Sequence, residues 1–150
     1  MTVYFADTSA FAKRYISEIG SGWVRTWITS SSGNTIIISS ISTVEFISLL
    51  ERRRKEGEVT LTAFSQLKAG FLVHARRQYK QIQMSQQVIR LAQSYAERHG
   101  LRALDSLQLA AAMAAAQRLS LIPTFVTADQ RLFTAAAAEG FPVEDPNAHP

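Results

Sequence analysis

The amino-acid sequence predicts an α/β fold, a three-layer α/β/α sandwich with a central parallel sheet. Its short runs of β-branched and aromatic residues are apolar without alternation, which suits strands that are buried on both faces. Helical patterns separate these runs, and strands that alternate with helices imply right-handed βαβ crossovers. A chain of 150 residues is long enough for one domain with its own hydrophobic core.

The expected strands are the runs T-V-Y-F-A, T-I-I-I-S and T-F-V-T, at residues 2–6, 35–39 and 124–127. Residues 81–84 are a further candidate strand.

Helical patterns fill most of the remaining chain, and some have readable ends. Ser42 and Glu45 have the S-x-x-E spacing of a capping box. Ser85 suits the N-cap of another helix, and Gly100 suits its left-handed C-terminal residue. The expected helices cover residues 9–16, 21–29, 42–55, 60–78, 85–99, 106–119 and 130–138.

The predicted domain spans residues 1–144, and residues 145–150 form a polar C-terminal tail. The sequence contains no internal repeat. Its first residues form a strand rather than a signal peptide, and no apolar run approaches the roughly 18 residues of a membrane span. The chain has no Cys, which suits a reducing compartment. We expect a cytoplasmic protein without a membrane segment.

Basic residues exceed acidic ones, with 16 Lys and Arg against 12 Asp and Glu and a net charge of +4. They are unevenly placed, because residues 52–55 form one basic block and no acid lies between Glu58 and Glu97. Such clusters indicate either a surface for a polyanion or a solvated helix face.

Acidic residues stand where the predicted elements meet. Asp7 follows the first strand, Asp129 follows the strand at 124–127, and Glu45 lies in the first turn of the helix after the second strand. The carboxyl ends of parallel strands face one crevice, where ligands bind. Asp105 begins the Ala-rich helix and joins the others if that helix starts at the same edge. The sequence therefore predicts a cluster of four carboxylates.

Four carboxylates in one place repel each other unless protons or a cation compensate them. Oxygen ligands favour hard divalent ions such as Mg²⁺ or Mn²⁺. One or two such ions can activate water for in-line attack on a phosphodiester. We therefore interpret Asp7, Glu45, Asp105 and Asp129 as the metal ligands and catalytic residues of a nuclease.

Each acid also has a purely structural interpretation. Asp7 and Asp105 suit N-caps, and Glu45 suits the capping box with Ser42. Asp129 suits the first turn of a helix, where the helix dipole favours an acid. Caps and metal ligands are therefore alternative explanations of the same four residues.

Several other chemistries lack residues that they need. Without Cys there are no thiolate metal sites and no Cys nucleophile. The Gly-rich motifs of P-loop and dinucleotide sites are missing, as are G-x-S-x-G and H-E-x-x-H. A phosphatase of the haloacid dehalogenase type needs a second Asp two residues after Asp7, where this chain has Ser9.

Four short motifs occur in a fixed order along the chain. They are D-T-S-A with K-R-Y within residues 7–15, T-V-E-F at 43–46, L-D-S-L-Q-L-A at 104–110 and T-A-D at 127–129. Together they resemble the PIN domain and, within it, the VapC toxins of type II toxin–antitoxin pairs. The resemblance spans nearly the whole chain and implies Mg²⁺- or Mn²⁺-dependent endoribonuclease activity. Its four acidic positions match Asp7, Glu45, Asp105 and Asp129.

The resemblance also implies a homodimer and a small antitoxin that blocks the acidic cleft. With RNA as substrate, we expect Lys13 and Arg14 to bind the phosphate backbone. The hydroxyls of Ser9 and Thr127 are candidates for orienting a phosphate, and turn or cap roles explain them equally well.

Two other functions remain open at this stage. A PIN-like binding or scaffold module would use the acids only as caps, and a phosphomonoesterase would release free phosphate instead of cutting RNA internally. Trp23 and Trp27, four residues apart on one helix face, belong either to the core or to a dimer or antitoxin surface.

Overall fold

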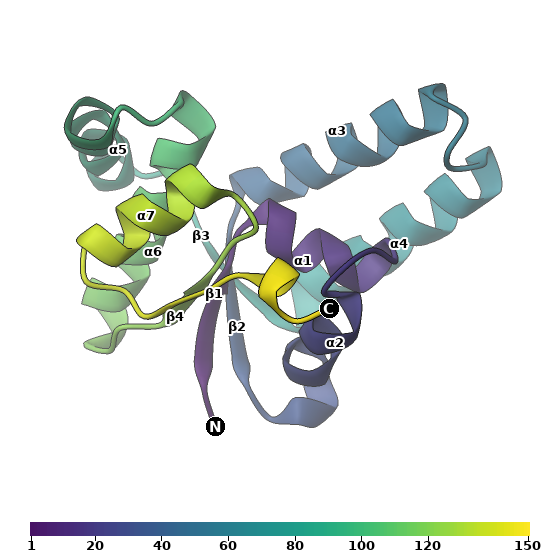
Figure 1. Ribbon diagram of the computed structural model, residues 1–150, viewed down its shortest axis with the longest axis horizontal. Coiled ribbons are helices and arrows are strands. Elements are labelled where there is room, and N and C mark those ends of the chain that lie inside the picture. Colours follow the sequence, from purple (N-terminus) through teal and green to yellow (C-terminus); the bar gives the residue numbers. More distant parts are fainter.

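The computed structural model describes all residues from 1 to 150. Five parallel strands form one sheet in the order β3-β2-β1-β4-β5. Figure 1 shows β4, β1 and β2 side by side in the middle of the molecule. Central strand β1 pairs with β2 and with β4, so that Phe5 lies between Ile37 and Phe125. The strands are β1 (Val3–Ala6), β2 (Thr35–Ser39), β3 (Tyr79–Ile82), β4 (Thr124–Val126) and β5 (Val143–Glu144).

The three predicted strands are confirmed, and the candidate strand at 81–84 exists with its start at Tyr79. Strand β5 was not predicted. It has only two residues and follows Pro142, whose carbonyl accepts a 2.8 Å hydrogen bond from the Phe125 amide. So short a run carries no recognisable strand pattern.

Helices fill the connections between strands. The seven α-helices are α1 (Thr8–Tyr15), α2 (Ser21–Ile28), α3 (Ile41–Lys55), α4 (Leu61–Arg77), α5 (Gln86–His99), α6 (Ala103–Leu119) and α7 (Gln130–Ala138). Two 3₁₀ turns, η1 (Ser30–Ser32) and η2 (Pro146–Ala148), complete the chain.

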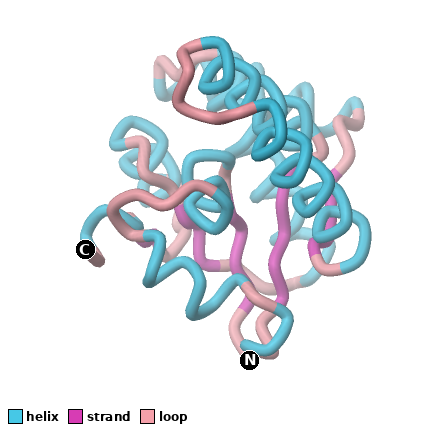
Figure 2. The backbone as a smooth tube through the Cα atoms, turned by 90° about the vertical axis from the view of Figure 1, so that its right-hand side faces the viewer, coloured by secondary structure: helices cyan, strands magenta, loops and turns pink.

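Alternate strand residues face two separate hydrophobic layers. Phe5 and Ile37 pack with α5, α6 and α7 on one face of the sheet, whereas Ile36 and Ile38 pack with α1 to α4 on the other. The strands therefore lie between two layers of helices, as Figure 2 shows. This arrangement confirms the predicted three-layer sandwich.

Two of the expected helix ends agree with the structure and one does not. The Ser85 hydroxyl caps α5, and Gly100 ends that helix with φ +62°. The capping box of Ser42 and Glu45 is wrong, because α3 begins one residue earlier, after Ser40. Ser42 is instead buried, and its hydroxyl faces helix α6.

Aromatic rings fix the helices that approach the carboxyl edge of the sheet. The Phe71 ring of α4 lies 5.2 Å from that of Phe11 in α1 and 4.7 Å from that of Phe46 in α3, measured between ring centroids. On the opposite face, the small Ala side chains of α6 allow α6 to pack closely against α5 and the sheet. The ends of α1, α3 and α6 are therefore rigidly placed.

The last six residues fold back onto the domain. Turn η2 buries Pro146, and the His149 ring stacks on Trp23 with 4.1 Å between centroids. Trp27 is a core residue that stacks on Tyr4 at 4.5 Å.

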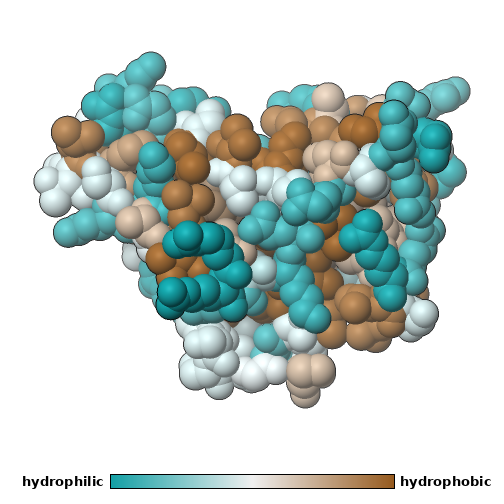
Figure 3. All heavy atoms as spheres, turned by 180° about the vertical axis from the view of Figure 1, so that it is seen from behind, coloured by the Kyte–Doolittle hydropathy of each residue, from teal (hydrophilic) through white to brown (hydrophobic).

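None of the helices combines the length and the apolar character that a membrane-spanning helix needs. On the rear face, hydrophobic side chains gather along the upper edge among hydrophilic ones (Figure 3).

Candidate active site

The four predicted acids line one cavity at the carboxyl edge of the sheet. Asp7 follows β1, Asp129 follows β4 by two residues, Glu45 lies near the start of α3 and Asp105 lies in the first turn of α6. We call this hollow of about 200 Å³ the acid cavity. Its wall also contains Thr8, Ser9, Leu49, Arg52 and Gln108. The structure thus brings together side chains that lie up to 122 residues apart, from Asp7 to Asp129.

Asp7 is the most enclosed of the four acids, with 5% of its surface exposed. Burial raises its pKa to about 7, and the nearby Glu45 charge adds to the increase. Hydrogen bonds from Ser9, Thr127 and the Ala10 amide act in the opposite direction and stabilise the charged form. A carboxyl group with this pKa exchanges its proton near neutral pH.

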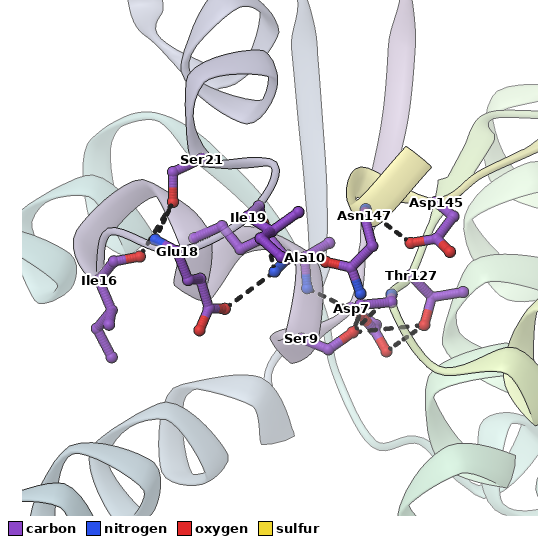
Figure 4. Close-up of polar contacts among 12 residues, drawn as sticks. Asp7, Ser9, Ala10, Ile16, Glu18, Ile19, Ser21, Thr127, Asp145 and Asn147 are labelled. Atoms are coloured by element: carbon purple, nitrogen blue, oxygen red, sulfur yellow. Dashed lines mark hydrogen bonds and ion pairs between the residues drawn. The ribbon is translucent and has the colours of Figure 1, made fainter. Parts of the chain in front are cut away.

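The predicted substrate-binding hydroxyls hold Asp7 in place. The Ser9 hydroxyl donates to Asp7 Oδ1 at 2.7 Å, and the Thr127 hydroxyl donates to Asp7 Oδ2 at 2.9 Å. Each hydroxyl oxygen also accepts a backbone N–H, from Ala128 and Asp129 respectively. Figure 4 shows Ser9 and Thr127 directed at the Asp7 carboxylate from two different segments. Both therefore orient Asp7, and contact with a substrate remains a prediction.

Glu45 is held by a residue that sequence reasoning missed. The side chain of Gln108 donates to Glu45 Oε1 at 2.8 Å and to the Ser42 hydroxyl at 2.7 Å. The Thr8 hydroxyl gives Glu45 a second contact, to Oε1 at 3.3 Å. A signal was present in the sequence, because Gln108 is a polar residue in an apolar Ala-rich helix, three positions after Asp105 and so on the same face.

Gln108 also leaves one buried atom without a partner. Gln108 is 2% exposed, and its Oε1 makes no hydrogen bond. Because the carboxylate of Glu45 accepts hydrogen bonds, the NH₂ end of the amide must face Glu45. The oxygen end is therefore a buried acceptor without a partner in the protein.

Arg102, a second residue that sequence reasoning missed, lies between the two remaining acids. Its guanidinium is 3.6 Å from Asp105 Oδ2 and 3.8 Å from Asp129 Oδ2. Burial and the Asp129 charge raise the pKa of Asp105, and Arg102 partly offsets this rise. The pKa of Glu45 is raised by burial and by the Asp105 charge. The acids therefore influence one another along the whole cavity.

The structure separates the two predicted basic residues. Lys13 is 4% exposed, lines a hollow beside the acid cavity, and donates to Glu18 and to the Ile19 carbonyl. Arg14 faces away from the acids and bonds to Gln78, Tyr79 and His74 instead. The structure does not bring Arg14 to the acid cavity.

Capping explains some of the acids but not all of them. Asp7 caps α1 and Asp129 caps α7, each through one carboxylate oxygen. Glu45 belongs to no capping box, and Asp105 is not the N-cap of α6, because that helix begins after Arg102. Asp105 nevertheless lies in the first turn of α6, where the helix dipole favours an acid, so the structural alternative leaves only Glu45 without a reason to be acidic.

The family model of the PIN domain matches residues 4–138. The chain belongs to the PIN domain family. This PIN domain is also 31% identical over 146 residues to Ribonuclease VapC47 of Mycobacterium tuberculosis, and the match covers 96% of this chain and 97% of that protein.

Solved structures share the fold of this PIN domain. VapBC2 of Rickettsia felis, bound to a DNA fragment from its promoter, matches with a TM-score of 0.64 and 17% identity over 96% of this chain and 98% of that chain. VapC20 of Mycobacterium tuberculosis, a toxin that cleaves the sarcin–ricin loop, matches with a TM-score of 0.64 and 18% identity over 92% and 95% of the two chains.

Nucleases of the PIN family use divalent metal ions, and the acid cavity offers the right donors for one. Carboxylate oxygens are hard ligands, and four of the residues that line the cavity carry them. In the present side-chain arrangement, no three acidic or histidine groups converge as a ready metal set. Asp105 and Asp129 share Arg102 instead. The chemistry of the donors fits a cation that competes with this arginine.

Proposed function

We propose that this PIN domain is a Mg²⁺- or Mn²⁺-dependent endoribonuclease and the toxin of a VapBC-type toxin–antitoxin pair. One observation carries the proposal, the presence of Asp7, Glu45, Asp105 and Asp129 in the lining of one cavity of a PIN fold. The relative that matches almost end to end is a ribonuclease by name, which supports RNA as the substrate.

The acids would hold the metal ion, and the surrounding residues would keep them in position. When bound, a divalent ion polarises the phosphodiester and makes water more acidic. Ser9 and Thr127 fix both oxygens of Asp7, whereas Gln108 and Thr8 fix one oxygen of Glu45. These buried contacts prepare the carboxylates for the reaction, so little reorganisation is needed.

Arg52 is the residue best placed to hold the scissile phosphate. It lies on the exposed side of α3, lines the acid cavity, and forms no ion pair with the protein. A free guanidinium beside four carboxylates can bind a phosphate through bidentate hydrogen bonds. RNA affinity should therefore depend on Arg52 and on salt.

A small antitoxin is the partner that the comparisons support. The Rickettsia felis structure is a VapBC complex, and a toxin–antitoxin complex of Klebsiella pneumoniae matches with a TM-score of 0.59. We propose that a cognate antitoxin covers the acid cavity, that the chain forms a homodimer, and that it acts in the cytoplasm.

The proposal is tested by incubating the purified protein with a long RNA, in Mn²⁺, in Mg²⁺ and in excess chelator. We expect internal fragments with either metal and none in chelator, and no activity in Asp7→Asn. Release of free phosphate without internal cuts would indicate a phosphomonoesterase. Binding of RNA without any cleavage would indicate a PIN-like binding module.

A further inference from the structure

A second hollow lies beside the acid cavity, and we call it the side pocket. Its volume is about 420 Å³, within the range of roughly 300–1,000 Å³ that is typical of small-molecule sites. It shares Ser9 and Leu49 with the acid cavity, so the two hollows adjoin. A ligand that reaches the acids can therefore extend into the side pocket.

One wall of the side pocket consists of paired charges. Lys13 Nζ donates to Glu18 Oε1 at 3.0 Å and to the Ile19 carbonyl at 2.8 Å, which leaves its third N–H uncommitted. Arg53 lies 3.6 Å from the other oxygen of Glu18. Arg53 also pairs with Glu58 at 3.2 Å, so Glu18 and Glu58 balance the two cations, and the third N–H of Lys13 is the donor that remains free in this wall.

The other wall is built by the C-terminal turn η2. Asn147 lines the side pocket, and its side chain extends from η2 toward Ser9 and Asp7, opposite Glu18 and Ile19 (Figure 4). The backbone N–H of Asn147 donates to Asp145 Oδ1 at 2.8 Å, which fixes the turn. The side-chain amide of Asn147 makes no hydrogen bond within the protein. Residues 139–150 lie beyond the part of the chain that the PIN family model matches.

Two contacts anchor η2 to helix α2. Gly20 has φ +87°, and a Cβ at this position would collide with the Pro146 carbonyl. The stacking of His149 on Trp23 fixes the end of the segment. The turn is therefore a built wall of the side pocket rather than a free tail.

We propose that the side pocket binds the nucleotide adjacent to the scissile phosphate of a single-stranded RNA. This inference rests on the proposed nuclease function. Lys13 offers its uncommitted N–H to the phosphate of that nucleotide, and the apolar side chains of Ile19 and Leu49 contact its base. The Asn147 amide, which offers both a donor and an acceptor, reads the base edge. A duplex keeps its bases stacked and cannot place one in this hollow.

Two variants alter the wall of the side pocket that turn η2 forms, and they do so in different ways. Asn147→Ala deletes the amide of an exposed residue without threatening the fold. Gly20→Ala displaces η2, because the new Cβ meets the Pro146 backbone. Gly33→Ala is the matched control, since Gly33 has a similar φ of +74° with no atom within 4 Å of the added Cβ.

The first measurement is the affinity of metal-free protein for a labelled single-stranded oligoribonucleotide pool, followed by fluorescence anisotropy. We expect about 5- to 10-fold weaker binding in Asn147→Ala and Gly20→Ala, the loss of roughly one good base contact. Gly33→Ala should bind like the wild type, and a duplex RNA should bind all four proteins alike. Melting curves confirm that each variant is folded.

The second measurement maps cut sites in a long RNA. We expect wild-type protein to prefer one nucleotide beside the cut and Asn147→Ala to lose that preference. Unchanged affinity and unchanged cut sites in both variants would overturn the side-pocket assignment while leaving the nuclease proposal intact. An inactive wild-type protein whose binding still depends on Asn147 would overturn the nuclease proposal alone.

Discussion

Gln108 donates a hydrogen bond of 2.8 Å to Glu45 from within helix α6. The contact joins the two helix faces that enclose the acid cavity, because Glu45 belongs to α3 and Gln108 to α6. The side-chain oxygen of Gln108, Oε1, has no partner inside the protein. The buried NH₂ group of Gln108 therefore fixes the Glu45 carboxylate relative to Ser42 and helix α6.

Replacing Gln108 by Leu should therefore damage both stability and activity. The substitution leaves Glu45 and Ser42 without their buried donor, which should cost about 1–3 kcal/mol of unfolding free energy. We expect cleavage to fall at least 10-fold and the Mn²⁺-induced rise in melting temperature to shrink. Gln117→Leu is the control, because Gln117 lies on the same helix but is exposed. Equal behaviour of the two variants would contradict a positioning role for Gln108.

Arg102 should compete with a divalent cation for Asp105 and Asp129. Removing it in Arg102→Gln leaves the two acids without their shared cation. We expect Mn²⁺ to bind about 2- to 5-fold more tightly, the range of an exposed ion pair worth up to about 1 kcal/mol, since the Arg102 side chain is 76% exposed. Calorimetric titration measures the Mn²⁺ affinity of each protein. Arg118→Gln is the control, because Arg118 is an exposed residue of helix α6. Unchanged or weaker Mn²⁺ binding would show that Arg102 does not compete.

The pKa of Asp7 predicts an unusual dependence of stability on pH. The folded protein raises this pKa from 3.8 to about 7, so the folded state binds the proton more tightly than the unfolded state. Stability from this group is therefore complete at acidic pH and is lost as pH rises from about 4 to about 7. Glu45 and Asp105, whose pKa values are also raised, act in the same direction.

Urea unfolding of metal-free protein between pH 5 and pH 8 tests this dependence. Wild-type protein should lose stability toward pH 8, and Asp7→Asn should lose less, because Asn carries no buried charge. Asn147→Ala should follow the wild-type curve. If Asp7→Asn and the wild type show the same slope, Asp7 does not titrate in this range.

Patterns of residue type were enough to predict the sheet and the position of the acids. The continuous apolar strands and the acids at their ends follow from local sequence, and parallel pairing then brings those ends to one edge. Strand β5 could not be predicted, because two residues carry no periodicity. The predicted start of α3 is wrong because Ser42 and Glu45 have the spacing of a capping box. In the structure the Ser42 hydroxyl instead accepts a hydrogen bond from Gln108 of α6.

The residues that support the acids were harder to predict because they act across the fold. Gln108 reaches Glu45 over 63 positions of sequence separation, and only packing of α6 against the start of α3 makes the contact. Lys13 and Arg14 are adjacent in sequence, but helix geometry turns Lys13 toward the side pocket and Arg14 toward α4. Residues 145–150 read as a polar tail because nothing local reveals the contacts of Pro146 and His149 with α2.

The central claim is that the acid cavity binds the metal ion that supports RNA cleavage, and Glu45 tests it most directly because it caps nothing. The measurement compares Glu45→Gln with Glu51→Gln, a partly exposed residue of the same helix whose carboxylate pairs only with Arg54. For each variant, Mn²⁺-induced thermal stabilisation and internal cleavage of RNA are recorded together. We expect both to collapse in Glu45→Gln and to remain at wild-type levels in Glu51→Gln. Full Mn²⁺ stabilisation and full cleavage in Glu45→Gln would contradict the claim.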